Sequence, residues 1–166
     1  KSRMQTAFAV SIEAKKGIST GISAFDRAKT IKVAINQNSK KKDIVSPGHV
    51  FPLVARNGGV LERAGHTEAS IDISKLSKLN PSSVICEVMN EDGRMARLDD
   101  LIKFSNKHNI KIASIADIIA YRFKNEKLVF RCNSKNIILN QNQKIQLYVY
   151  KNKLNKYESY VLSKGK

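Results

Sequence analysis

Four segments of the chain combine glycine turns with side chains suited to a phosphate, a metal ion or proton transfer. The most informative one spans residues 58–69 and holds Arg63, His66 and Thr67 around Gly65. The planar fork of Arg63 and the hydroxyl of Thr67 can hold phosphate oxygens, and the histidine between them can ligate a metal. Because packing alone does not explain all three at a loop-to-helix junction, we interpret this segment as a binding site.

Two further segments carry groups suited to acid–base chemistry. His49 lies in a turn flanked by Pro47 and Pro52, which suits a rigidly held general acid or base, although a lone histidine there is often structural. Glu87 interrupts the apolar run at 84–89. A buried carboxylate costs several kcal/mol unless it is paired. Glu87 therefore faces either a cleft, as an acid or base, or water on an edge strand.

The fourth segment, at 20–30, contains Thr20, Ser23, Asp26 and Arg27. Hydroxyl groups at a helix start offer donors to an anion, so these residues are candidates for phosphate binding or for structural support. The alternative is simple capping of the helix, with Ser23 as the N-cap. Taken alone, the segment favours capping.

The net charge of +16 raises the alternative of nucleic-acid binding. The excess is mostly lysine, 22 Lys against 8 Arg, and it is spread along the chain without an aromatic-and-basic RNA-binding signature. We therefore expect no specific nucleic-acid partner. Steering of a phosphorylated substrate is a simpler use of such a field.

The pattern of elements favours an α+β fold, because strands alternate with helices. We expect strands at 6–12, 50–55, 84–89 and 110–113, and helices at 24–36, after Gly65, at 98–108 and at 115–121. After Arg122 the pattern becomes strand-like, at 128–131, 145–150 and 157–162. This change predicts a boundary near 123–127, with one domain at 1–123 and the start of another at 124–166.

The remaining composition argues against several classes of protein. The longest apolar runs are far shorter than the roughly 20 residues that span a bilayer, so we expect a cytoplasmic protein without a membrane partner. The two cysteines, Cys86 and Cys132, form neither a disulfide framework nor zinc-ligand spacing.

In this order, the four segments resemble the 3,4-dihydroxy-2-butanone 4-phosphate synthase family. The resemblance runs from about Thr6 to Arg122 with short gaps and rests on the stretches TGISAFDRAKTI, PGHVFPLVA, GGVLERAGHTEASID, ICEVMNEDGRMARLDDLIKFSNKH and IADIIAYR. It implies the layered α+β fold of that family. It also implies a homodimeric, magnesium- or manganese-dependent lyase of riboflavin biosynthesis that converts D-ribulose 5-phosphate to 3,4-dihydroxy-2-butanone 4-phosphate and formate.

The resemblance also implies a role for each matching residue. His66 is expected to ligate Mg²⁺ (or Mn²⁺), and His49 and Glu87 are expected to be catalytic, with Glu87 also contacting the substrate. The substrate loop is expected to comprise Arg63, Ala64, Gly65, His66 and Thr67, with Arg63 and Thr67 on the sugar phosphate.

The chain departs from the family at its start, because no acidic segment of the kind that supplies the second magnesium ligand precedes Thr6. A metal held by His66 alone would bind weakly, since magnesium prefers carboxylate oxygens. We therefore expect little activity from this chain alone. The tail at 150–165 resembles the start of a GTP cyclohydrolase II domain, which suggests the central piece of a fused protein. A non-catalytic structural or regulatory remnant remains the alternative.

Overall fold

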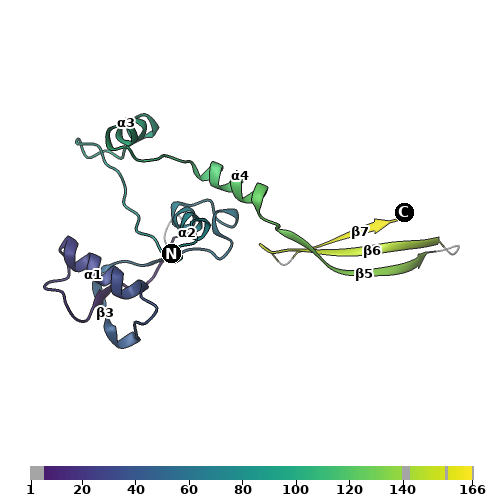
Figure 1. Cartoon of the computed structure of the whole chain (residues 1–166), viewed down its shortest axis with the longest axis horizontal. Coiled ribbons are helices and arrows are strands. Elements are labelled where there is room, and N and C mark those ends of the chain that lie inside the picture. Colours follow the sequence, from purple (N-terminus) through teal and green to yellow (C-terminus); the bar gives the residue numbers. More distant parts are fainter. Residues whose placement is uncertain (1–5, 140–142, 156, 166) are drawn as a thin grey trace. The chain divides into compact units, whose positions relative to one another are not determined.

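The computed structural model of the chain describes residues 6–139, 143–155 and 157–165 (Figure 1). The chain divides into two compact units, Lys1–Ile115 and Ala116–Lys166. The predicted domain boundary at 123–127 lies after this division and stays a prediction. Helices and strands occur in both halves of the sequence, as the α+β expectation requires.

Two short antiparallel pairs open the first unit. Strand β1 (Ala7–Phe8) pairs with β4 (Leu53–Val54), and β2 (Ile12–Ala14) pairs with β3 (Ile44–Val50). The two partners of each pair are far apart in sequence. The pairing therefore brings the segment around His49 back to the start of the chain.

Helix α1 (Ala24–Ile35) forms where the sequence predicts it. Ser23 caps the helix, because its hydroxyl oxygen accepts a hydrogen bond from the Asp26 amide at 3.0 Å. The fully buried Thr30 attaches α1 to β2 by accepting a hydrogen bond from the Ala14 amide at 3.0 Å. A bond of this kind contributes about 1 kcal/mol net, and more is lost if the buried amide is left unpaired.

Helix α2 (His66–Leu76) also forms as predicted, after two short 3₁₀ turns, η1 (Lys41–Asp43) and η2 (Gly59–Leu61). Its buried face carries Glu68, Ala69 and Asp72, spaced so that they line one side of a helix. Asp72 accepts a hydrogen bond from the Val60 amide at 2.8 Å. This contact fixes η2 against the helix.

The predicted strands at 84–89 and 110–113 are wrong. Residues 83–88 and 110–114 carry no regular structure, and only a single antiparallel bridge joins Met89 to Met95. A strand needs a neighbour to pair with its amides and carbonyls. Within the described residues, the first segment is bridged only at its end, at Met89, and the second segment has no strand partner. Between them, α3 (Leu98–His108) forms as predicted and ends at Asn109, which adopts a left-handed conformation with φ of 52°.

The second unit is an antiparallel sheet preceded by a helix. Helix α4 (Ile115–Asn125) is followed by β5 (Val129–Leu139), β6 (Gln143–Asn152) and β7 (Glu158–Ser163), which lie side by side in that order (Figure 1). The strand-like pattern predicted after Arg122 is confirmed. Each hairpin joins strands that are neighbours in sequence, which is why local patterning was sufficient to predict them.

Few apolar side chains are buried in the described part of the chain. The buried apolar residues are all small or medium-sized, namely Ala14, Val60 and Ala69. The buried polar residues are Asp26, Thr30, Glu68, Asp72 and Ser74. Polar contacts between segments, rather than a large apolar core, therefore position the candidate site. Among the described helices, none is long and apolar enough to cross a membrane.

Candidate active site

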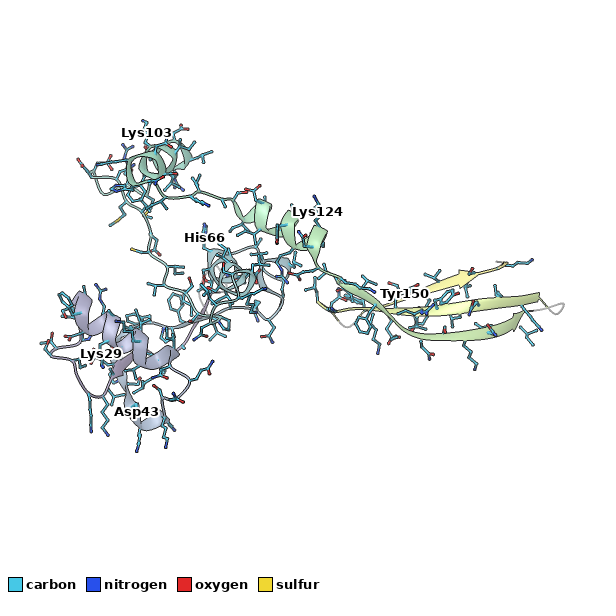
Figure 2. All side chains as sticks on the ribbon, viewed as in Figure 1. Lys29, Asp43, His66, Lys103, Lys124 and Tyr150 are labelled. Carbon is cyan, nitrogen blue, oxygen red and sulfur yellow. The ribbon has the colours of Figure 1, made fainter. Side chains whose placement is uncertain are left out.

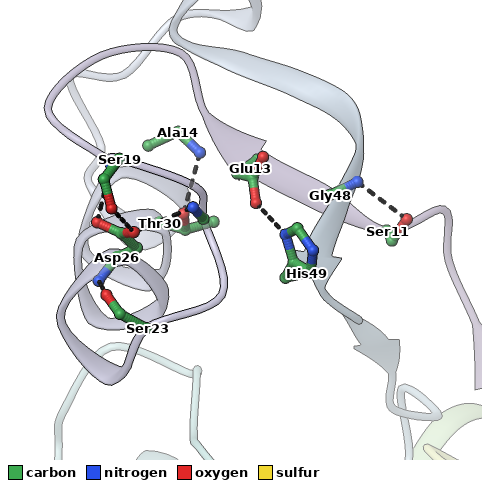
Figure 3. Close-up of polar contacts among 10 residues, drawn as sticks. Ser11, Glu13, Ala14, Ser19, Ser23, Asp26, Thr30, Gly48 and His49 are labelled. Atoms are coloured by element: carbon green, nitrogen blue, oxygen red, sulfur yellow. Dashed lines mark hydrogen bonds and ion pairs between the residues drawn. The ribbon is translucent and has the colours of Figure 1, made fainter.

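An irregular pairing of β2 with β3 positions His49. Ile12 pairs with Val50, but the next residue, Glu13, pairs with Val45. Residues 46–49 of β3 are therefore extra relative to β2. Such a bulge bends the strand and redirects a side chain, and here the imidazole of His49 meets the carboxylate of Glu13 at 2.5 Å between Nδ1 and Oε1 (Figure 3).

Ser11 and Gly48 hold this bulge in place. The Ser46 hydroxyl donates to the Ser11 carbonyl oxygen at 2.7 Å. The Gly48 amide donates to the Ser11 hydroxyl at 3.1 Å (Figure 3). A Cβ atom on Gly48 would lie only 2.2 Å from the backbone of Ile12. Only glycine therefore allows the two strands to approach this closely beside His49.

Arg63 is held by an ion pair with the buried Glu68. The guanidinium Nη1 donates to Glu68 Oε2 at 2.5 Å, and Nη2 donates to the Thr6 hydroxyl at 3.2 Å. Glu68 also accepts a hydrogen bond from the Arg56 amide at 3.0 Å. The sequence predicts that Arg63 can hold a phosphate. In the structure, the Arg63–Glu68 pair also joins the loop before α2 to Thr6 and to Arg56.

The other residues of the loop lie around the start of α2. A Cβ on Gly65 would lie 2.4 Å from Arg63 Nη1 and 2.7 Å from Glu68 Oε2, so glycine leaves room for the ion pair. Ala64 and His66 are exposed, and Thr67 is half-buried. His66 is the first residue of α2, and its side chain is labelled in Figure 2. Its imidazole is therefore accessible to a ligand.

Asp26 organises the turn before α1. Its carboxylate accepts hydrogen bonds from the Ser19 hydroxyl at 2.7 Å, the Ser19 amide at 3.1 Å and the Gly21 amide at 3.0 Å. These bonds, led by the Ser19 hydroxyl, hold the pKa of Asp26 below its ordinary value of 3.8. Because Asp26 already occupies the amides of the turn, the geometry favours structural support over phosphate binding there. Thr20 and Arg27 are exposed.

Glu87 lies in the irregular segment at 83–88 and is exposed. The strand expected to present it is absent, so the structure does not bring Glu87 to His49. Among the described contacts, none joins His49, His66 and Glu87 to one another. The structure instead forms three local clusters, around His49, Arg63 and Asp26.

The described residues do not by themselves form a magnesium site. Within residues 6–139, 143–155 and 157–165, there is no group of three or more His, Cys, Asp and Glu side chains that could hold a metal ion. His66 is an available nitrogen ligand, but magnesium requires mainly oxygen ligands in octahedral geometry.

Sequence analysis missed Glu13 and Glu68. Glu13 contacts His49, which lies 36 positions later in the sequence. The only local indication of its role is a charged residue between Ile12 and Ala14 in a strand-like pattern. Glu68 stands five positions after Arg63 in the loop-to-helix segment. A separation of five residues allows Arg63 and Glu68 to form an ion pair, but Arg63 also fits a ligand-binding role, so the sequence does not distinguish the two.

The sequence profile of the 3,4-dihydroxy-2-butanone 4-phosphate synthase family matches residues 1–121. The chain belongs to this family. The riboflavin biosynthesis protein RibBA of Aquifex aeolicus (strain VF5) is 52% identical over 162 residues, which cover 96% of this chain and 40% of that protein.

Solved structures agree with this assignment. The two-domain 3,4-dihydroxy-2-butanone 4-phosphate synthase RibBX from A. baumannii superposes with a TM-score of 0.85 at 45% identity, covering 99% of this chain and 48% of that one. A 3,4-dihydroxy-2-butanone 4-phosphate synthase in complex with two magnesium ions superposes with a TM-score of 0.67 at 32% identity, covering 75% and 63%. In each comparison the chain spans less than two thirds of its relative.

Proposed function

We propose that the protein containing this chain converts D-ribulose 5-phosphate to L-3,4-dihydroxy-2-butanone 4-phosphate and formate, a step of riboflavin biosynthesis. The family match over residues 1–121 carries this proposal. We further propose a bifunctional protein in which a GTP cyclohydrolase II-like domain follows, as the resemblance of the tail at 150–165 implies.

The proposal assigns acid–base chemistry to His49 and Glu87. Nδ1 of His49 faces Glu13, and its side chain is 45% exposed, which leaves Nε2 for a substrate proton. The base removes a proton from the carbon next to the substrate carbonyl. Loss of one water and a skeletal rearrangement then follow, and uptake of one water releases C4 as formate, so the overall reaction has no net change in water. Glu87 contacts the substrate and takes part in a further proton transfer.

Arg63 and Thr67 hold the sugar phosphate in this proposal. Arg63 carries five N–H donors, and its Glu68 and Thr6 contacts orient the guanidinium. Arg63 precedes the first residue of α2 by three positions. Both its positive charge and the N-terminus of the helix favour an anion there. Ala64 and Gly65 complete the loop by keeping bulk away from the ligand.

We also propose dependence on Mg²⁺ or Mn²⁺, with His66 as one ligand. The ion would stabilise the negative charge of an enediolate when bound. The described residues bring together no group of three or more His, Cys, Asp and Glu side chains, so a bound ion would need oxygen ligands besides His66. The protein is further proposed to be a cytoplasmic homodimer, which cell fractionation and light scattering would check.

Formate release from ribulose 5-phosphate tests the function. In the complete natural protein with Mg²⁺, we expect His49→Ala and His66→Ala each to reduce turnover at least about a hundredfold. The matched control is His108→Ala, which removes the third histidine; His108 lies in α3, where its ring is 4.5 Å from that of Phe104. We expect this control to retain activity.

Two further arms sharpen the test. Chelation should abolish turnover and added Mg²⁺ should restore it, whereas residues 1–166 alone should release no formate. A folded complete protein without formate release would contradict the proposal and favour a non-catalytic remnant. Equal loss in all three histidine variants would indicate misfolding rather than catalysis.

A further inference from the structure

Glu13 and His49 form a contact to which the family resemblance assigns no role. The Nδ1–Oε1 distance is 2.5 Å, and the Glu13 side chain is only 15% exposed. A carboxylate that accepts from Nδ1–H fixes both the orientation of an imidazole ring and the nitrogen that carries its proton. The remaining nitrogen, Nε2, is then available as a base.

The Glu13 carboxylate also lies close against Gly21. A Cβ atom built on Gly21 would lie 1.6 Å from Glu13 Oε1 and 2.2 Å from its Cδ, so the carboxylate fills the space beside this glycine. Gly21 also has a φ of 86°, a conformation that glycine adopts easily. Its amide donates to Asp26, which fixes the turn in place.

Contacts of the backbone hold the segment that carries His49. The bulge begins after the Ile12–Val50 pair, and two hydrogen bonds to Ser11 secure it, from Ser46 and from Gly48; Figure 3 shows the second of these and the contact of His49 with Glu13. Glu13 and His49 are thus constrained by separate sets of contacts. An exposed ion pair between two unrestrained side chains would lack such support.

We propose that Glu13 is a positioning residue for His49: it accepts the Nδ1 proton and leaves Nε2 unprotonated toward the substrate. This inference rests on the proposed catalytic role of His49. Glu13 itself does not touch the reacting atoms. Its removal is therefore expected to lower kcat while leaving KM nearly unchanged, because ground-state binding of the phosphate does not involve it.

The tautomer of His49 provides a test that is independent of activity. Ring ¹⁵N spectra of the complete natural protein, labelled at histidine, would be recorded at about pH 8.5, where histidine rings are in general neutral. The His49 signal is assigned by its loss in His49→Ala. We expect an Nδ1–H tautomer in the natural sequence, a mixture of tautomers in Glu13→Ala, and partial retention in Glu13→Gln, which keeps an acceptor oxygen.

Kinetics and folding complete the experiment. We expect kcat for formate release to fall about tenfold or more in Glu13→Ala, to recover partly in Glu13→Gln, and to remain unchanged in the control Glu158→Ala, which removes an exposed glutamate of the second unit. Circular dichroism would verify that each variant is folded.

Two results would overturn the inference: an Nε2–H tautomer of His49 in the natural sequence, or a kcat of Glu13→Ala within twofold of the natural value. The tautomer of the natural sequence decides the question even if a variant fails to fold. If the natural protein shows the Nδ1–H tautomer but releases no formate, the proposed function fails while the Glu13–His49 contact stands.

Discussion

At the scale of single residues, Arg63 has two roles that mutation can separate. Its guanidinium is paired with Glu68, whose side chain is 2% exposed. Removing one partner of a buried ion pair leaves an uncompensated charge and costs about 3 kcal/mol or more. We therefore expect Arg63→Ala to lower the free energy of unfolding by about 3 kcal/mol, measured by urea denaturation.

The control for Arg63 is Arg94→Ala. Arg94 also forms an ion pair, with Asp92, but its side chain is 83% exposed. Exposed pairs contribute little because water and salt screen them, so Arg94→Ala should leave the unfolding free energy almost unchanged. Equal effects of the two variants would contradict a structural role for Arg63 and leave only its proposed contact with phosphate.

At the scale of elements, the start of α1 should be sensitive to acid. The folded-state pKa of Asp26 is lowered from 3.8, chiefly by hydrogen bonds from Ser19. The carboxylate therefore stabilises the fold above its unfolded pKa, and this contribution is lost as the pH falls from about 3.8 through the lower folded value.

Asp26→Asn should remove the contribution of Asp26 to the pH dependence of stability. We expect the variant to lower the thermal midpoint at pH 7, with the difference from the natural sequence shrinking as the pH approaches 3. Thermal unfolding followed by circular dichroism at several pH values would measure it. Asp99→Asn, an exposed carboxylate of the first turn of α3, is the control; a pH-independent effect of Asp26→Asn would contradict the assignment.

Sequence patterns predict those elements whose interactions are local in sequence. The cap of Ser23 on α1, the start of α2 at His66 and the hairpins of β5 to β7 depend on residues close in sequence, and all were predictable. The bulge that joins His49 to Glu13 depends on strands more than 30 positions apart, so no local pattern could predict it. The apolar run at 84–89 has strand character, but within the described residues its pairing is limited to the single Met89–Met95 bridge.

At the scale of the whole molecule, the described chain exposes many large apolar side chains. Phe25 is 88% exposed, Val10 71% and Phe51 64%, whereas the buried apolar residues are Ala14, Val60 and Ala69. Exposed apolar surface of this kind binds hydrophobic dyes and partner surfaces. We therefore expect residues 1–166 alone to enhance ANS fluorescence strongly at neutral pH.

The complete natural protein is the comparison for this measurement. If additional parts cover these side chains, its ANS signal per molecule should be several-fold lower under the same conditions. A weak signal from residues 1–166 would mean that the apolar side chains are covered within this chain or by self-association, which light scattering would distinguish.

The close approach of Gly48 to Ile12 has a consequence for mutational screening. A Cβ on Gly48 would lie 2.2 Å from backbone atoms, so every substitution there must displace a strand. Under the proposed function, a growth screen without added riboflavin should find Gly48 as intolerant of substitution as the adjacent His49, although Gly48 supplies no reactive group. Protein abundance measured for the same library would separate the two positions: Gly48 variants should be depleted as protein, whereas variants of the proposed base His49 should accumulate in inactive form.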